Sequence, residues 1–475
     1  MFGKLQITIF AEINALIAMY YTRLIDKDLA EWAAGRNHKP VLLRGARQVG
    51  KSTAVRHLGE TFEHYIEINF EKFPEFNTLF EGNLDVMRIT SQMEALTGKR
   101  ITPGKTLLFL DEIQNCPEAI MSLRFFKEDL PGLHVIAAGS LLEFALDELP
   151  TYGVGRIHSI FMYPMTFDEF LYANGENMLI NARNHASIDN PLPEPLHNKL
   201  STLFRTYILV GGMPEAVATW VSSHDFLECQ KIQDDIIISY EDDFPKYKRK
   251  VDPQLLRLTM RSAAVQCSKK FIFADVGGGY RTEEVKKALE MLILAGICVP
   301  VTRTAANGLP LGSESDASMR KILLLDSGLL LRLLNMTLGD ISELTSLILT
   351  SSAPDLINKG AIAEMIAGLE MMRYQNSNIR HELYFWIRNA KNSQAEVDYV
   401  TTLRLQILPI EVKAGMRGGM KSLWIFMREK KLDKAVRCSL ENFGSFEYID
   451  NENRGATRLV TICPIYAISM MSRLL

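Results

Sequence analysis

The sequence predicts an α/β protein in three folded parts: a parallel-sheet domain, a central helical domain and a second α/β domain. Three observations support this fold class. The 475 residues are enough for about three domains of ~150 residues each. Short apolar segments alternate with helical patterns near both ends of the chain. Hydrophobic residues make up 47 % and charged residues 23 %, as in folded globular proteins.

The first domain is predicted to span residues 23–200, after an extension of residues 1–22. Its strands are short apolar runs without polar alternation, which is typical of parallel strands buried on both faces. These runs are residues 40–44, 65–70, 106–110 and 134–139. A polar stretch at residues 181–199 contains three prolines and fits neither helix nor strand periodicity. We interpret this stretch as the surface loop that closes the domain.

Residues 201–320 form the predicted central domain, which is mostly helical in its periodicity. A helix over residues 282–296 places Val285, Leu289 and Leu292 on one face, and a strand over residues 297–302 follows it. Helix, turn, helix and strand in this order indicate a winged helix.

Residues 321–475 form the predicted second α/β domain. A helical stretch that starts at residue 321 precedes three strands, one helix and a last strand. The strands are residues 382–388, 396–403, 407–413 and 435–439, and the helix is residues 419–431.

The composition restricts partners and location. The 53 lysines and arginines and the 56 aspartates and glutamates give a net charge of −3, so a nucleic-acid site must be a local basic patch. The six cysteines form no C-x-x-C pair and no Cys/His cluster, which argues against a zinc site or a disulfide framework and favours a cytoplasmic location. Glu12 and Asn14 interrupt the apolar run at residues 5–21, so we interpret this run as an amphipathic helix or an extension and expect no membrane contact.

A phosphate-binding loop follows the first predicted strand. The pattern G-x-x-x-x-G-K-[ST] is matched by Gly45, Ala46, Arg47, Gln48, Val49, Gly50, Lys51 and Ser52, with Thr53 opening the next helix. Backbone N–H groups of such a loop surround the β-phosphate, Lys51 reaches the β- and γ-phosphates, and Ser52 supplies a hydroxyl ligand to magnesium. The loop predicts ATP and Mg²⁺ as cofactors.

Two acids end the third predicted strand. Asp111 and Glu112 follow the apolar run at residues 107–110, at the edge where a parallel sheet presents its ligand groups. Asp111 is predicted to hold magnesium through its water shell, and Glu112 to activate the attacking water as a general base. Two adjacent acids predict hydrolysis of ATP as well as binding.

Two further residues have alternative interpretations. Ser140 ends the fourth predicted strand, where it either senses the γ-phosphate or caps the helix over residues 141–146. Arg156 either neutralises charge on the γ-phosphate, in its own or a neighbouring subunit, or is an ordinary surface arginine.

These motifs resemble the AAA+-like ATPases of bacteria and archaea that carry a C-terminal domain of unknown function. The resembling segments are LLRGARQVGKS (42–52), FLDEIQ (109–114), AGS (138–140), GR (155–156) and YPMTFDEF (163–170), and beyond them GGMPE (211–215), LDSGL (325–329) and IEVK (410–413). The resemblance covers nearly the whole chain. It implies a P-loop ATPase domain, and it implies a homo-oligomer in which Arg156 reaches the nucleotide of a neighbour.

The predicted winged helix offers a weak nucleic-acid surface. Polar contacts to DNA would come from Arg281, Lys286 and Lys287, and phosphate contacts from Lys269 and Lys270. Acids at positions 283, 284 and 290 of the same helix repel phosphates, so the alternative is a structural spacer. The basic run at residues 246–250 follows three acids, and we interpret it as a solvated loop.

The last domain contains a D…E-x-K pattern. Asp398 lies on one predicted strand, and Glu411 and Lys413 share one face of the next because alternate strand residues point the same way. This constellation is that of restriction-endonuclease-like folds, in which the acids bind magnesium and the lysine stabilises developing charge. Glu364, on the preceding helix, resembles the extra metal ligand of such folds. The alternative is a salt-bridged strand pair without chemistry.

The sequence therefore predicts a Mg²⁺-dependent ATPase that couples ATP hydrolysis to the action of a nuclease-like domain on DNA or another nucleic acid. A nuclease-like fold does not by itself imply cleavage, because folds outlive their chemistry. The alternative is an ATP-dependent switch that recognises a protein partner and carries an inactive nuclease-like domain.

Overall fold

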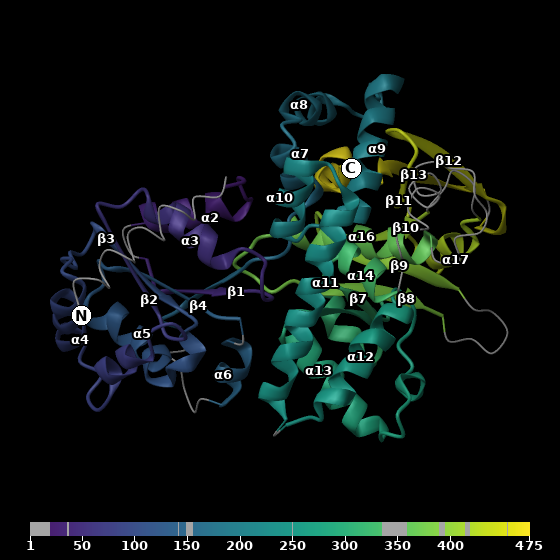
Figure 1. Ribbon diagram of the computed structural model, residues 1–475. Helices are drawn as coiled ribbons and strands as arrows, with labels where there is room; N and C mark the ends of the chain where they lie inside the picture. Colours follow the sequence, from purple (N-terminus) through teal and green to yellow (C-terminus); the bar gives the residue numbers. More distant parts are fainter. Residues whose placement is uncertain are drawn as a thin grey trace. The chain divides into compact units, whose positions relative to one another are not determined.

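The computed structural model describes residues 20–35, 38–140, 142–148, 155–248, 250–334, 359–388, 395–413, 419–453 and 455–475 (Figure 1). They form two compact units, which we describe separately. The first contains the chain up to Arg44 together with Gly50–Ile160, and the second contains Gly45–Val49 together with Phe161–Leu475. Residues 1–19 of the predicted N-terminal extension lie outside the described residues.

The first unit is built on a five-stranded sheet with the strand order β2-β3-β4-β1-β5. β1, β2, β3 and β4 pair in parallel, which confirms the predicted parallel sheet. β5 was not among the predicted strands, because its four residues include the polar His158 and Ser159. The elements are α2 (Ile25–Ala34), β1 (Val41–Arg44), α3 (Lys51–Gly59), β2 (His64–Asn69), α4 (Val86–Thr97), β3 (Thr106–Asp111), α5 (Pro117–Asp129), β4 (His134–Ala138), α6 (Leu142–Glu148) and β5 (His158–Phe161).

The packing of this unit fixes the position of the carboxyl edge of its sheet. Every residue of β3 and β4 is buried, as expected for strands that are covered on both faces. Ile89 of α4 and Ile120 and Leu123 of α5 belong to the same apolar core as Leu108 of β3. Because β4 lies between β1 and β3, the carboxyl ends of β1 and β3 meet at one edge of the sheet. This edge carries the acidic pair and the start of α3 with Lys51 and Ser52.

The second unit begins with a helical region. Its helices are α7 (Phe167–Ala173), α8 (Asn177–His185), α9 (Glu194–Val210), α10 (Pro214–Ser223), α11 (Phe226–Asp243), α12 (Pro253–Val265) and α13 (Thr282–Leu294). The surface loop predicted over residues 181–199 is wrong for most of its length, since only residues 186–193 lie between α8 and α9. Pro195 lies in the first turn of α9, where a missing N–H breaks no helical hydrogen bond.

An eight-stranded mixed sheet completes the second unit, with the order β12-β13-β11-β10-β9-β8-β6-β7. Its elements are β6 (Cys298–Thr304), β7 (Ser315–Leu324), α14 (Ser327–Leu333), α16 (Lys359–Arg373), β8 (Leu383–Ile387), β9 (Glu396–Leu403), β10 (Gln406–Val412), α17 (Lys421–Glu429), β11 (Lys434–Ser439), β12 (Gly444–Asp450), β13 (Ala456–Pro464) and α18 (Met471–Leu474). The helix predicted to start at residue 321 is wrong at that point, because Lys321–Leu324 are the last residues of β7.

The region predicted as a winged helix is continuous with this sheet. α12 and α13 are followed by the antiparallel pair β6 and β7, and β6 also pairs in parallel with β8. The hairpin is therefore an edge of the eight-stranded sheet. The element order agrees with the predicted order, and the winged helix itself stays a prediction.

The order α16, β8, β9, β10, α17, β11 places the residues of the D…E-x-K pattern on neighbouring strands. Leu423 and Phe426 of α17 pack with Trp386 and Val397 in one apolar core. β9 and β10 pair antiparallel, with Ile410 opposite Tyr399. All six cysteines are buried free thiols. No helix among the described residues combines the length and the apolar character needed to cross a membrane.

Candidate functional site

The loop between β1 and α3 has the backbone geometry of an anion-binding turn. Gly45, Gln48 and Gly50 have positive φ angles of 149°, 64° and 97°. Alternation of such residues with ordinary ones turns successive N–H groups towards one side, where a phosphate is bound. A Cβ atom at Gly45 would lie 2.1 Å from the carbonyl oxygen of Met162, so only glycine fits there. Lys51 opens α3 and is only 8 % exposed.

The structure brings Ser52 and Asp111 together at the carboxyl edge of the sheet. The Ser52 hydroxyl is 3.1 Å from both carboxylate oxygens of Asp111, and the Asn69 side-chain amide donates to Asp111 Oδ2 at 3.1 Å. Asn69 ends β2 and lies opposite Asp111 in the strand register. The Ser52 hydroxyl and the Asp111 carboxylate are hard oxygen ligands of the kind that Mg²⁺ takes, directly or through water.

Burial, followed by the charges of Glu112 and Glu67, raises the pKa of Asp111 from 3.8 to about 6. The folded protein thus binds more protons than the unfolded chain between these two values, so stability falls as pH rises through this interval. We expect Asp111→Asn to stabilise the nucleotide-free protein by about 1–3 kcal/mol above pH 6 and not at all below pH 4. Thermal unfolding across this pH range checks the prediction, and a gain of the same size at every pH would contradict it.

Glu112 is positioned by two polar neighbours. It has a left-handed backbone, with φ of 49°, directly after β3. The Gln114 side-chain amide donates to Glu112 Oε2 at 2.6 Å, and the Ser140 hydroxyl donates to the same oxygen at 3.3 Å. The structure thus places Ser140 beside the predicted base, at the end of the neighbouring strand β4. A hydrogen-bonded carboxylate at this edge is suited to orienting a water molecule.

Arg156 lies on the surface of the first unit. Its guanidinium pairs with Glu128 of α5, and its side chain is 53 % exposed. An arginine exposed in this way is available to a neighbouring subunit.

Two of the motifs that lie beyond the first unit contact each other. The Gly212 N–H donates to Asp326 Oδ2 at 2.6 Å, and a Cβ atom at Gly211 would lie 2.2 Å from Asp326 Oδ1. Gly211 also has a φ of 76°, which favours glycine. Arg373 of α16 donates to the Leu325 carbonyl at 2.5 Å. The GGMPE and LDSGL motifs therefore have a packing role in the second unit.

The basic residues proposed for DNA contact are exposed. Lys286 pairs with Glu283 at 2.8 Å on α13 itself. The exposed basic residues proposed for DNA contact are Lys269, Lys270, Arg281, Lys286 and Lys287. In the basic run at residues 246–250, Lys246 pairs with Asp243 at 2.7 Å, and Arg249 lies outside the described residues.

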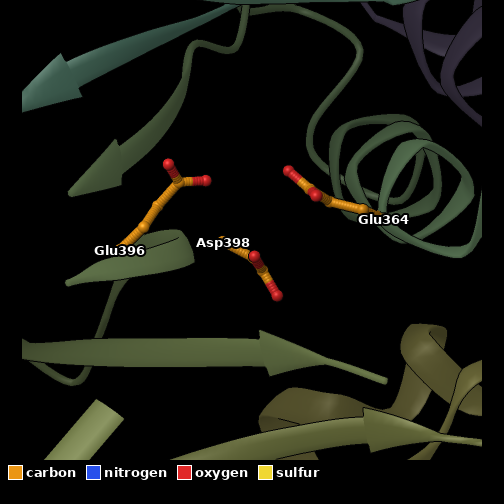
Figure 2. Close-up of side chains that lie close together, drawn as sticks. All are labelled: Glu364, Glu396 and Asp398. Atoms are coloured by element: carbon orange, nitrogen blue, oxygen red, sulfur yellow. The ribbon is translucent and has the colours of Figure 1, made fainter. Parts of the chain in front are cut away.

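A second candidate site lies in the mixed sheet. Among the described residues, Glu364, Glu396 and Asp398 each offer a carboxylate oxygen, and these oxygens lie within 4.8 Å of one another. Figure 2 shows Glu364 reaching from α16 towards the strand that carries the other two. The predicted set contained Glu364, Asp398 and Glu411. The structure groups Glu396 with the first two, and Glu411 is not part of this close group.

Glu411 and Lys413 lie beside this group. Continuing the register by one position from Ile410 and Tyr399 places Glu411 opposite Asp398. Lys413 Nζ donates to Glu411 Oε1 at 2.5 Å, whereas Glu411 Oε2 is buried and has no hydrogen-bond partner among the described residues. Burial and the charge of Asp398 raise the pKa of Glu411 to about 7. Buried carboxylate oxygens normally have a partner, and a bound cation would supply the partner that Glu411 Oε2 lacks.

Lys321 of β7 contacts this group directly. Its ammonium lies 2.7 Å from Glu364 Oε1 and also contacts Glu396 Oε1. Lys321 is only 1 % exposed. Burial lowers the pKa of Lys321, but the charges of Glu364, Glu396 and Asp398 outweigh it and raise the pKa above its ordinary value.

Sequence reasoning missed four residues of the two sites: Asn69, Gln114, Lys321 and Glu396. Asn69 has a signal, since a polar residue ends an apolar strand of the parallel sheet. Glu396 also has one, because it is two positions before Asp398 on the same strand. Lys321 had no signal, since its partners are 43 and 75 positions away.

Comparisons with known families match three separate parts of the chain. A model of an AAA domain matches residues 37–171, and two models of domains of unknown function, DUF8612 and DUF4143, match residues 201–339 and 359–460. A comparison with curated proteins found no match.

Solved structures show a distant likeness to this chain. A Walker-type ATPase of Pyrococcus abyssi is 16 % identical with a TM-score of 0.43, and the match covers 66 % of this chain and 96 % of that one. The Orc1 protein of Aeropyrum pernix in complex with DNA is 12 % identical with a TM-score of 0.28, over 67 % and 92 % of the two chains. The Hsp104–ADP complex of S. cerevisiae is 11 % identical with a TM-score of 0.27, over 58 % and 38 %.

The parallel sheet, the loop between β1 and α3 and the AAA match all concern the same part of the sequence. The chain therefore contains an AAA+-like ATPase domain with a nucleotide-binding P-loop.

Proposed function

We propose that this protein hydrolyses ATP with Mg²⁺ and couples the hydrolysis to cleavage of a nucleic acid by its C-terminal domain. The observation that carries the first half is the contact of Ser52 with Asp111, with Glu112 one residue further along the chain. The bound metal supplies charge neutralisation at the phosphates. Ser52 and Asp111 would hold it, and the Lys51 ammonium neutralises charge on the β- and γ-phosphates.

Glu112 is proposed as the base that takes a proton from the attacking water. Its Oε2 accepts hydrogen bonds from Gln114 and Ser140, so the carboxylate has a fixed direction before the nucleotide arrives. Positioning of this kind lowers the entropy cost of bringing water in line with the γ-phosphate. Ser140 couples the base to the end of β4, which agrees with the sensor interpretation.

For the C-terminal domain, we propose a restriction-endonuclease-like fold with a divalent-metal site. The supporting observations are the element order α16, β8, β9, β10, α17, β11, the approach of Glu364 to Asp398, and the register position of Glu411 opposite Asp398. The carboxylates would hold the metal, and Lys413 would stabilise negative charge that develops on the phosphate. The substrate is proposed to be DNA or another nucleic acid, which the exposed basic residues of α13 help to bind.

A second candidate function is an ATP-dependent switch that recognises a protein and carries an inactive nuclease-like domain. The Lys321 ammonium favours it, because this cation already neutralises two carboxylates of the cluster. Incubation of the protein with ATP, Mg²⁺ and a panel of DNA and RNA separates the candidates. Phosphate release together with strand cleavage supports the first, and phosphate release without cleavage or nucleic-acid binding supports the second.

We also propose that the protein assembles into a homo-oligomer in which Arg156 acts on the nucleotide of a neighbouring subunit. Mixing Arg156→Ala with Glu112→Gln subunits is then expected to restore part of the ATPase activity, because some interfaces combine an intact base with an intact arginine. Phosphate release measured across mixing ratios checks this. Activity that stays at the sum of the two separate variants would exclude a shared site.

A further inference from the structure

The carboxylate cluster of the second unit has more negative than positive charge. Glu364, Glu396 and Asp398 form the cluster, Glu411 extends it from the neighbouring strand, and two ammonium groups pair with these acids, those of Lys321 and Lys413. In the ionised state the cluster thus carries an excess of two negative charges. A divalent cation would cancel this excess, whereas a third lysine would not.

The Lys321 ammonium lies in a site formed by carboxylates and an aromatic ring. Its ammonium contacts two carboxylates, and it lies 5.1 Å from the centre of the Phe385 ring, within the range of a cation–π interaction. The Glu364 and Glu396 oxygens that pair with Lys321 belong to the same two carboxyl groups that approach Asp398. An ammonium and a divalent cation repel each other strongly at such distances in a buried site. An ammonium that stays on Glu364 and Glu396 therefore weakens the binding of a divalent cation to the same carboxylates.

Glu411 supplies independent evidence that a further ligand belongs here. This residue is 4 % exposed, and its Oε2 has no hydrogen-bond partner among the described residues. It lies opposite Asp398 on the neighbouring strand, and the ion pairs of Lys321 are with Glu364 and Glu396. Lys321 therefore satisfies one side of the cluster and leaves the Glu411 oxygen unsatisfied.

We propose that the Lys321 ammonium is an internal cation that competes with a divalent metal for Glu364 and Glu396. The metal site then forms only when this ammonium moves away. In the metal-free protein, Lys321 therefore occupies the carboxylates and keeps the C-terminal domain inactive. The flexible four-carbon side chain of lysine permits such a movement. This inference rests on the proposed metal site, and it assigns to Lys321 a gating role that the D…E-x-K pattern does not contain.

The test replaces the competing cation by an apolar side chain of similar length, Lys321→Met. In the absence of nucleotide, this variant is expected to bind Mn²⁺ about tenfold or more tightly than the wild type, because the cluster keeps all its carboxylates and loses one positive charge. Calorimetric titration measures the affinity, and thermal unfolding with and without Mn²⁺ measures the stabilisation by bound metal. Adding Asp398→Asn to Lys321→Met is expected to remove the gain, which distinguishes this site from the nucleotide site.

Lys199→Met is the matched control, because Lys199 forms a comparable 2.7 Å ion pair with Glu176 on the surface. Equal Mn²⁺ affinity of Lys321→Met and the wild type would overturn the inference. If Lys321→Met does not fold without metal, recovery of folding in Mn²⁺ supports the inference, and failure to recover overturns it. Strand cleavage is followed separately: a gain in Mn²⁺ binding without cleavage removes the nuclease proposal only, whereas wild-type cleavage with unchanged affinity in the variant removes the gating role only.

Discussion

Glu112→Gln is expected to leave ATP binding intact and to reduce ATP hydrolysis by about 10²–10⁴-fold, because a glutamine keeps the size of the side chain and cannot accept a proton. The hydrogen bonds from Gln114 and Ser140 are directed at an oxygen that glutamine retains, so the local geometry is expected to persist. Nucleotide affinity by calorimetry and phosphate release under saturating ATP measure the two effects separately.

Lys51→Ala is the contrasting variant, and it is expected to abolish nucleotide binding itself, because it removes the buried ammonium that faces the β- and γ-phosphates. Glu118→Gln, an exposed acid of α5, is the matched control and is expected to hydrolyse ATP at the wild-type rate. Equal hydrolysis by the wild type and Glu112→Gln would remove Glu112 from its role as the base.

Asp398→Ala is expected to reduce Mg²⁺- or Mn²⁺-dependent cleavage of nucleic acid by at least about 100-fold and to leave ATP hydrolysis unchanged. Asp398 combines two functions at the cluster. Its carboxylate is one of the three that approach a common point, and its Oδ2 also accepts a 2.8 Å hydrogen bond from the Val412 N–H. Cleavage of labelled DNA and RNA and phosphate release, measured on the same preparation, separate the two activities.

Asp433→Asn is the control for this variant, since Asp433 is an exposed aspartate outside the cluster. Its cleavage rate is expected to match that of the wild type. Cleavage that survives in Asp398→Ala, or that disappears equally in both variants, would count against a metal site at Asp398.

The sequence was sufficient for the parts of the fold that depend on local pattern. Strands β1, β2, β3 and β4 were predicted to within one residue at each end, because β1, β3 and β4 are mostly continuous apolar runs and β2 carries the buried pair Ile66 and Ile68. The acidic pair was predicted because it directly follows the apolar run at residues 107–110. The loop over residues 181–199 was predicted wrongly, since a proline in the first turn of a helix looks like a breaker in sequence.

The residues of the candidate sites also divide into those that a local pattern predicts and those whose contacts depend on the folded backbone. Lys51, Ser52, Asp111 and Glu112 carry their chemistry in short motifs, so their types and spacing were readable directly. Gln114 lies within the acidic motif, but its hydrogen bond to Glu112 depends on the left-handed turn at Glu112. This turn has no signal in the residue type.

The sequence by itself determined the P-loop, the acidic strand end and the positions of the D…E-x-K residues, because each depends on neighbours a few positions away. Only the tertiary structure decided that Lys321, in a stretch predicted to be helical, lies on a strand and pairs with Glu364 and Glu396. The tertiary structure also decided a one-residue register shift between β8 and β9. Next to this shift, two consecutive residues of β9, Asp398 and Tyr399, both approach Glu364 of α16. Strand order and register follow from the packing of distant segments, and the composition of any one segment does not contain them.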